Sequence, residues 1–478
     1  MKKKRKIRLR WIFPLILTVI VGVLLVYAIN YTLADEGGIS FGGLVRTDTF
    51  YVIVIFLLLI PVLLGILLLA GVFGKQKKSK KKKPTKTLIC SEDGSVLLAT
   101  DQISAAVGGT KKKEEVPENK ERFCMLGEID RNSGKYGHAI YERGITLDIF
   151  CDDFRNYAAS QLRLYYDIAD IRRFIAGMAV SKLVILQGMS GTGKTSLAHA
   201  FGSFTDNTST VIPVQPMWKE RTDLVGYYNE FTKRFNETLL LQKMYEANYS
   251  KDMYVTVLDE MNIARVEYYF AEFLSLLELP NPEERYIDVV SDKWETDPKQ
   301  LRDGRIKLPE NMWFIGTANN DDSTFAISDK VYDRAMILNL DAKSERFAAP
   351  KTRKTIISSE QFVALVDQAI KEYGVSKRNK QRLEKLDKYL IDHFHITFGN
   401  RIMKQINTYI PVYVACGGDE LDALDDILAK KVIRKLETQN PIYLRNTAEG
   451  LIAYIDELFG VENMTLCKEH IHRLQRNA

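Results

Sequence analysis

A glycine-rich stretch between an apolar run and a helical pattern is the feature that most constrains the fold of this chain. Residues 183–187 have the pattern of a buried strand, and a helix is expected from Lys194 onward. Between them lies the pattern G-x-x-x-x-G-K-T, whose glycines let the backbone wrap closely around a phosphate group. The helix N-terminus adds a partial positive charge at the same place. The sequence therefore predicts a phosphate-binding loop formed by Gly188, Met189, Ser190, Gly191, Thr192, Gly193, Lys194, Thr195 and Ser196.

A second apolar run, residues 254–258, ends in the two carboxylates of Asp259 and Glu260. An apolar run ending in acids is a weak signal alone, because many strands end in solvated carboxylates. Its position after a phosphate-binding loop makes the signal strong. We expect Lys194 to reach the β- and γ-phosphates of a nucleotide, and Thr195 and Asp259 to hold Mg²⁺. Glu260 is then placed to polarise the attacking water.

A third run, residues 312–317, leads to Asn319, whose side chain is a candidate to orient the same water. The alternative is an ordinary turn residue. Strands at 183–187, 210–214, 254–258 and 312–317, separated by helical patterns, predict an α/β P-loop fold with a parallel sheet and helices on both faces. A hairpin is expected between residues 286–290 and 305–308.

Strand patterns are not recognised after about residue 340. Apolar residues at helical spacing predict helices over residues 359–373, 379–394, 401–414, 421–436 and 446–459. The sequence thus predicts a separate α-helical lid domain at residues 346–478, after a nucleotide-binding α/β domain at 150–345. Residues 84–149 are expected to be a polar linker with a small, poorly defined region.

Two uncharged apolar runs, residues 11–30 and 50–73, lie near the N-terminus. Each is long enough to cross a hydrocarbon layer about 30 Å thick, so both are predicted to be transmembrane helices within an N-terminal segment 1–83. Seven Lys or Arg residues precede the first run, and a block of lysines follows the second. The positive-inside rule therefore places the N-terminus and everything after residue 75 in the cytoplasm, with the loop 31–49 outside. The predicted location is the cell membrane, as a protein with two spans.

The first run has an alternative reading as a cleaved signal peptide ending near Ala34. Its apolar stretch is longer than the roughly 7–15 residues of such a segment, and either reading leaves the lysine block cytoplasmic. The block at residues 75–83 also suits binding to anionic lipid headgroups, at about 1 kcal/mol per lysine. The alternative is a topology signal and a flexible tether.

The net charge of +6 comes from the two N-terminal basic blocks, and the rest of the chain has more acidic than basic residues. A mildly acidic body lacks the broad positive field of non-specific nucleic-acid binding proteins, so direct nucleic-acid binding is not expected.

The combined motifs resemble the AAA+ superfamily, in the branch of the McrB-type restriction NTPases, the MoxR proteins and the dynein-related ATPases. Besides the phosphate loop and Asp259–Glu260, the similar stretches are residues 223–227, 258–265 and 309–319. The resemblance covers about residues 150–440 and leaves out the membrane segment. It implies an ATPase that works as a ring, hexameric by analogy.

The resemblance also implies roles for Asn319, as the sensor-1 residue, and for two arginines. Arg334 is the candidate arginine finger, with Lys330 as a rival and a simple salt bridge as the alternative. Arg401 is the candidate sensor-2 residue that contacts the nucleotide from the helical lid. The alternative is that Arg401 has a purely structural role. The McrB type has a run of arginines at the finger, whereas Arg334 stands alone before Ala335.

The sequence thus predicts Mg²⁺-dependent hydrolysis of ATP, with GTP as the other possible nucleotide. We expect a membrane-anchored ATPase that remodels a partner protein at the cytoplasmic face. One alternative is a motor subunit of a restriction- or defence-like complex. Another is a scaffold that assembles on nucleotide without hydrolysing it, against which the presence of Glu260 argues.

Overall fold

The computed structural model describes residues 88–90, 96–98, 121–319, 324–341 and 344–477. The predicted transmembrane helices at residues 11–30 and 50–73, the loop between them and the basic blocks lie outside these ranges. Within the described ranges, no helix combines the length and the apolar character needed to cross a bilayer. The chain divides into two compact units, and nearly all of the described residues belong to the second, residues 90–97 and 102–478.

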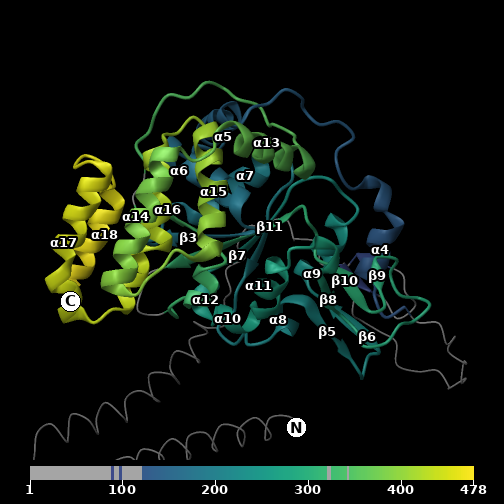
Figure 1. The fold of residues 1–478 in the computed structure, drawn as a ribbon. Coiled ribbons are helices and arrows are strands. Elements are labelled where there is room, and N and C mark those ends of the chain that lie inside the picture. Colours follow the sequence, from purple (N-terminus) through teal and green to yellow (C-terminus); the bar gives the residue numbers. More distant parts are fainter. Residues whose placement is uncertain (1–87, 91–95, 99–120, 320–323, 342–343, 478) are drawn as a thin grey trace, which may run out of the picture. The chain divides into compact units, whose positions relative to one another are not determined.

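The centre of this unit is a five-stranded sheet in the order β12-β3-β11-β7-β4, with every neighbouring pair parallel (Figure 1). The strands, in the order of the sheet, are β12 (Met336–Asn339), β3 (Leu183–Gly188), β11 (Met312–Asn319), β7 (Tyr254–Asp259) and β4 (Thr210–Pro213). Because the strands are parallel, their carboxyl ends meet at one edge. Gly188, Asp259 and Asn319 all lie at that edge.

Both faces of the sheet are covered, as the continuous apolar pattern of the strands requires. Along β3 the side chains alternate, so Val184 and Leu186 join one buried cluster while Leu183 and Ile185 join another. The first face is covered by α5 (Leu147–Leu162), α6 (Ile168–Val180) and α7 (Lys194–Phe204). The second is covered by α8 (Arg221–Val225), α9 (Leu239–Ala247), α10 (Val266–Tyr269), α11 (Ala271–Glu278) and α12 (Asp329–Tyr332).

Two small antiparallel sheets flank the second face. One is a hairpin of β5 (Gly226–Asn229) and β6 (Arg234–Glu237). The other joins β8 (Tyr286–Asp288), β10 (Arg305–Lys307) and β9 (Leu301–Arg302). Helix α4 (Met125–Arg131), inside the region expected to be linker, packs on the same face through Leu126 and Ile129. Just before it, the buried guanidinium of Arg122 bonds Asp297 at 2.6 Å. Residues from about 121 onward are therefore part of the folded body.

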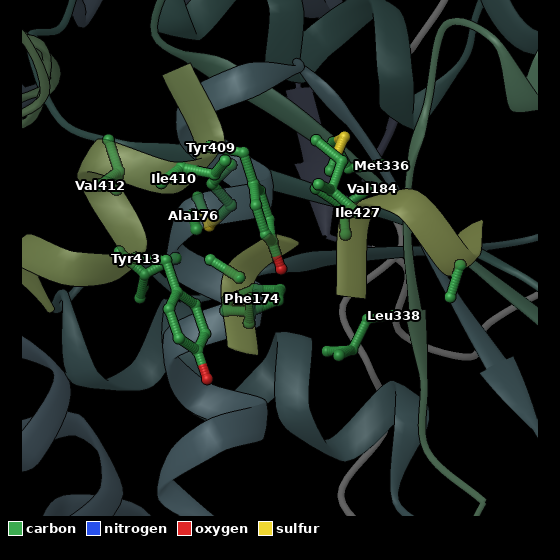
Figure 2. Packing of buried hydrophobic residues seen from close by; sticks show 14 of the residues in the cluster. Phe174, Ala176, Val184, Met336, Leu338, Tyr409, Ile410, Val412, Tyr413 and Ile427 are labelled. Atoms are coloured by element: carbon green, nitrogen blue, oxygen red, sulfur yellow. The ribbon is translucent and has the colours of Figure 1, made fainter. Parts of the chain in front are cut away.

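The C-terminal helices are α13 (Ser359–Glu372), α14 (Lys377–Phe394), α15 (Gly399–Ala415), α16 (Glu420–Lys431), α17 (Pro441–Phe459) and α18 (Thr465–Asn477). They share one core with α6, β3 and β12. Figure 2 shows this packing, in which side chains of α6, β3 and β12 meet Tyr409 and Ile410 of α15 and Ile427 of α16. A buried ion cluster adds to it, since Asp426 contacts Arg173 at 3.1 Å and accepts a hydrogen bond from Tyr409 at 2.6 Å. The C-terminal helices thus share a hydrophobic core with part of the α/β region.

Most of the predicted elements are confirmed to within a few residues, including the 286–290 and 305–308 hairpin, which is observed as β8 and β10. The elements that were not predicted include the β5–β6 hairpin, the strands β9 and β12 and helix α4. The parallel sheet with helices on both faces, followed by an α-helical region, has the architecture of an α/β P-loop NTPase.

Candidate active site

The loop from β3 to α7 depends on two glycines. Gly188 has φ +144°, and a Cβ there would lie 2.3 Å from the carbonyl oxygen of Leu340, just after β12. Any side chain would therefore push the end of β12 away from the loop. Gly193 has φ +97° and begins α7, where its own carbonyl accepts a hydrogen bond from the Tyr166 hydroxyl at 3.1 Å. These contacts fix both ends of the predicted phosphate-binding loop.

Lys194 lies within this loop and is only 7% exposed. Its Nζ donates to the carbonyl oxygens of Gly188, at 3.0 Å, and Met189, at 2.7 Å. The Thr192 hydroxyl also donates to the Met189 carbonyl, at 3.1 Å. The loop thus closes around the ammonium group, which is where the sequence placed a phosphate-binding cation. Ser190, Gly191 and Ser196 complete the loop and the first turn of α7.

Asp259, at the end of β7, is the residue on which the neighbouring elements converge. Its Oδ1 accepts hydrogen bonds from the Thr195 hydroxyl at 2.8 Å and from the Thr317 hydroxyl at 2.9 Å. The carboxylate and the Thr195 hydroxyl are therefore adjacent, as a shared magnesium ion would require. Both are hard oxygen ligands of the kind that Mg²⁺ prefers. This donor set fits the predicted ion.

Glu260 follows in a left-handed backbone conformation, with φ 53° and ψ 46°. Such a conformation is uncommon for a residue with a side chain and is concentrated at functional sites. The Glu260 amide donates to the Thr317 hydroxyl oxygen at 2.9 Å, which holds the turn in place. The side chain itself is exposed at the carboxyl edge of the sheet.

Asn319 is directly opposite Gly188 in the register between β11 and β3. Its carbonyl accepts hydrogen bonds from the Asn262 side chain at 3.0 Å and from the Thr324 hydroxyl at 3.1 Å. The backbone at Asn319 is thus fixed beside the loop, and its half-buried side chain lies at the same edge as Glu260.

Arg334 lies near the amino ends of the strands, at the opposite end of the sheet from the phosphate loop. Met336 of β12 is aligned with Val184 of β3, and the Ser181 hydroxyl donates to the Arg334 carbonyl at 2.7 Å. Arg334 therefore lies beside Ser181 and Lys182, at least six residues before Gly188. At about 3.3 Å per residue, this places Arg334 about 20 Å from the loop of its own chain. Its guanidinium pairs with Glu278 at 2.6 Å, and its Nη1 donates to the carbonyl of Lys330 at 2.8 Å. Arg334 therefore does not reach the phosphate loop of its own chain.

Arg401 lies beside Arg334 and away from the loop. Its guanidinium pairs with the other oxygen of Glu278 at 2.5 Å. The structure thus brings both candidate arginines to one carboxylate, at the edge opposite Lys194. The expectation that Arg401 reaches over the nucleotide of its own chain finds no support in this placement.

The two arginines line a cavity of about 840 Å³ at this edge, together with Glu278, Lys182, Arg285 and Lys404. Lys182 lies over the ring of Trp313, 3.2 Å from its centroid, and burial lowers its pKa to about 7. The cavity therefore gathers several basic side chains together with the carboxylates of Glu278, Asp333 and Asp367, in a hollow large enough for a small ligand.

Sequence reasoning missed Thr317 and Glu278. Thr317 bonds both Asp259 and Glu260, but it comes from a neighbouring strand, and its place on a strand ending at Asn319 was the available signal. Glu278 ends a helix with an ordinary amphipathic pattern. Its role is recognised only from the structure, in which Arg334 and Arg401 both form ion pairs with its carboxylate.

Comparison with known families agrees with this geometry. Residues 183–335 match the AAA domain of the dynein-related subfamily. This segment of the chain is therefore similar to an AAA domain. The match spans the phosphate loop, Asp259–Glu260, Asn319 and Arg334. Members of this superfamily generally hydrolyse ATP with Mg²⁺, and the match is consistent with assembly into a ring.

Residues 350–478 match a domain of unknown function (DUF8727), which corresponds to the C-terminal helices. No curated protein matches the chain. Among solved structures, a full-length MCM homolog from Methanopyrus kandleri is similar with a TM-score of 0.34 and 9% sequence identity. The similarity covers 67% of this chain and 63% of that one.

Proposed function

We propose that this chain is a Mg²⁺-dependent ATPase whose AAA+ domain hydrolyses ATP at the carboxyl edge of its sheet. The observation that carries the proposal is the 2.8 Å hydrogen bond between Thr195 and Asp259. It joins the first residues of the phosphate-loop helix to the acidic end of β7, beside Glu260 and Asn319. These are the groups that phosphoryl transfer to water needs at one place.

Each residue has a role that its position supports. The loop amides and the Lys194 ammonium bind the phosphate oxygens, and the N-terminus of α7 adds its partial positive charge. Glu260 accepts a hydrogen bond from the attacking water and takes up its proton, while Asn319 orients that water from the neighbouring strand. The protein forms no covalent bond with the substrate in this scheme. The increase in the rate of hydrolysis therefore comes from positioning the reactants and from stabilising the charge that develops on the phosphate.

Thr195 and Asp259 are the residues that would hold Mg²⁺. The ion would neutralise charge that develops on the phosphate oxygens during transfer. Thr317 orients the Asp259 carboxylate from the side, because its hydroxyl donates to the same oxygen that Thr195 bonds. The ligand set is therefore held by a third residue before any ion binds.

Arg334 is proposed to act on the nucleotide of a neighbouring subunit. The rise per residue of a β-strand places it about 20 Å from the loop of its own chain. Its side chain lines a cavity that also contains several other basic side chains. An arginine supplied by a second copy is then the remaining route to the γ-phosphate. This arrangement makes a ring the working form, and Arg401 is placed to join Arg334 at the same interface.

The proposal is tested by steady-state phosphate release from the full-length protein in mild detergent. ATP turnover is expected with Mg²⁺, and chelation by EDTA should remove it, because the carboxylate of Asp259 has no function in hydrolysis without its ion. GTP is measured in parallel, since the phosphate loop does not distinguish the bases. Turnover that continues in EDTA, or no turnover with either nucleotide while binding persists, would contradict the proposal. The second result would favour a scaffold.

We also propose that the runs at residues 11–30 and 50–73 anchor the ATPase at the cytoplasmic face of the membrane, where it remodels a partner protein. Support comes from their length, lack of charge and flanking lysines. The full-length protein is expected to stay in the membrane pellet after washing with alkaline carbonate. A variant that begins at residue 84 should be released, and its retention in the pellet would argue against the anchor.

A further inference from the structure

The segment that carries Arg334 is short and has little structure of its own. It consists of α12, four residues long, and the turn from Asp333 to Ala335 that leads into β12. A helix of one turn is not stable by itself, because nucleation costs more than so few hydrogen bonds return. Its position must therefore be set by what it touches.

The apolar side chains of Val331 and Ala335 pack in the α/β core, but most of the hydrogen bonds and ion pairs described for this segment come from the C-terminal region. Lys431, at the end of α16, donates from Nζ to the carbonyl of Tyr332 at 2.6 Å and to the carbonyl of Ala335. These two residues flank Arg334. The side-chain amide of Gln405, on α15, donates to the carbonyl of Asp333 at 3.0 Å.

Arg434, one turn after α16, holds the start of the same segment. It pairs with Asp329 at 2.5 Å, and its guanidinium lies 4.0 Å from the centroid of the Tyr332 ring. From the α/β side, the Gln187 amide donates to the Tyr332 hydroxyl at 2.5 Å, and the Ser181 hydroxyl donates to the Arg334 carbonyl at 2.7 Å. Gln187 immediately precedes Gly188 of the phosphate loop. Tyr332 is therefore fixed between the loop and the C-terminal helices.

Lys431 is the contact whose chemistry is hardest to explain by packing alone. It is 3% exposed, and burial lowers its pKa to about 7, although Asp333 acts in the opposite direction. A methionine would fill a similar volume without desolvating an amine. What the amine adds is a pair of hydrogen bonds to the two carbonyls on either side of Arg334.

We propose that the C-terminal helical region positions the arginine finger, with Lys431 as the residue that fixes the turn carrying Arg334. Lys431 is a positioning residue, since it touches the backbone around Arg334 and not the nucleotide. Through this turn the C-terminal helices of one subunit set the activity of the site in its neighbour. The inference rests on the proposed ATPase function with Arg334 acting between subunits.

The test uses two full-length proteins mixed before nucleotide is added. The Glu260→Gln protein cannot hydrolyse ATP at its own site, but it still supplies Arg334 to a neighbouring subunit. The Arg334→Ala protein lacks this arginine, but its own site retains Glu260. Their mixture should hydrolyse ATP although each alone is nearly inactive. Lys431→Met is then added to one partner at a time. In the Glu260→Gln donor it should lower the activity of the mixture about tenfold or more, and in the Arg334→Ala acceptor it should change it by less than about twofold.

Lys435→Met in the donor is the matched control, because Lys435 follows Lys431 by about one turn and, among the described residues, makes no hydrogen bond or ion pair with the segment 329–335. It should leave the mixture unchanged. An equal loss with Lys431→Met in either partner would indicate a purely structural role, and no loss in the donor would overturn the proposal. If the starting pair shows no activity, the role of Arg334 between subunits fails first, and that result is seen before Lys431 is altered.

Discussion

Replacing Glu260 by glutamine is expected to lower ATP turnover by roughly 10²–10⁴-fold, the usual contribution of a positioned general base. The amide has nearly the same shape but cannot accept the proton of the attacking water. ATP binding should persist, because Lys194, the loop amides and the Thr195–Asp259 pair are unchanged. Steady-state phosphate release measures the first quantity, and equilibrium binding of a fluorescent ATP analogue measures the second.

Glu230→Gln is a suitable control for this experiment. Glu230 is an exposed carboxylate at the turn of the β5–β6 hairpin, where it pairs only with Lys233 at 2.9 Å among the contacts described for it. Its replacement should leave turnover unchanged. If Glu260→Gln kept full turnover, another group would have to be the base. If it lost ATP binding as well, damage to the loop would explain the result.

The phosphate loop could be predicted because it depends on residues that are adjacent in sequence. A strand, a glycine-rich turn and a helix N-terminus follow one another, and each has a local signal. The acidic end of β7 was recognisable for the same reason. The structure adds the 2.8 Å contact that brings the two together.

Thr317 could not be assigned because its function depends on the order of the strands. It meets Asp259 only because β11 lies beside β7 in the sheet, and the strand patterns alone do not fix that order. Strand β12 was missed because residues 336–338 form a short apolar run, which periodicity alone does not distinguish from a buried helix segment. Its position beside β3 nevertheless explains why residue 188 must be glycine.

The helices of the C-terminal region were predicted from their apolar spacing, but their partners were not. An amphipathic helix can pack on any apolar surface, so the sequence did not indicate that α15 and α16 share a core with α6 and β12. For the same reason Arg401 was expected near the nucleotide of its own chain. Its position on Glu278 follows from how α15 packs, which only the fold determines.

Replacing Arg334 by alanine is expected to lower turnover by about 10³-fold or more, within the range for an arginine finger supplied by another subunit. The binding of ATP should change little, since Arg334 lies at the edge opposite the loop of its own chain. Glu278 now holds both Arg334 and Arg401, so a finger that moves to a neighbouring phosphate must exchange this carboxylate for the phosphate oxygens. Arg334→Lys should recover little, because lysine cannot form the paired hydrogen bonds of a guanidinium.

Arg353→Ala provides the control for Arg334→Ala, because its side chain is 84% exposed and pairs with Glu142 at 3.4 Å, away from the cavity. Turnover per subunit should also rise with protein concentration in the wild type, since the finger of one copy serves the site of the next. Dilution should therefore lower wild-type turnover towards that of Arg334→Ala. A turnover that is independent of concentration down to a monomer, together with normal activity of Arg334→Ala, would show that the site is complete within one chain. Arg334 and Glu278 would then form an ordinary ion pair.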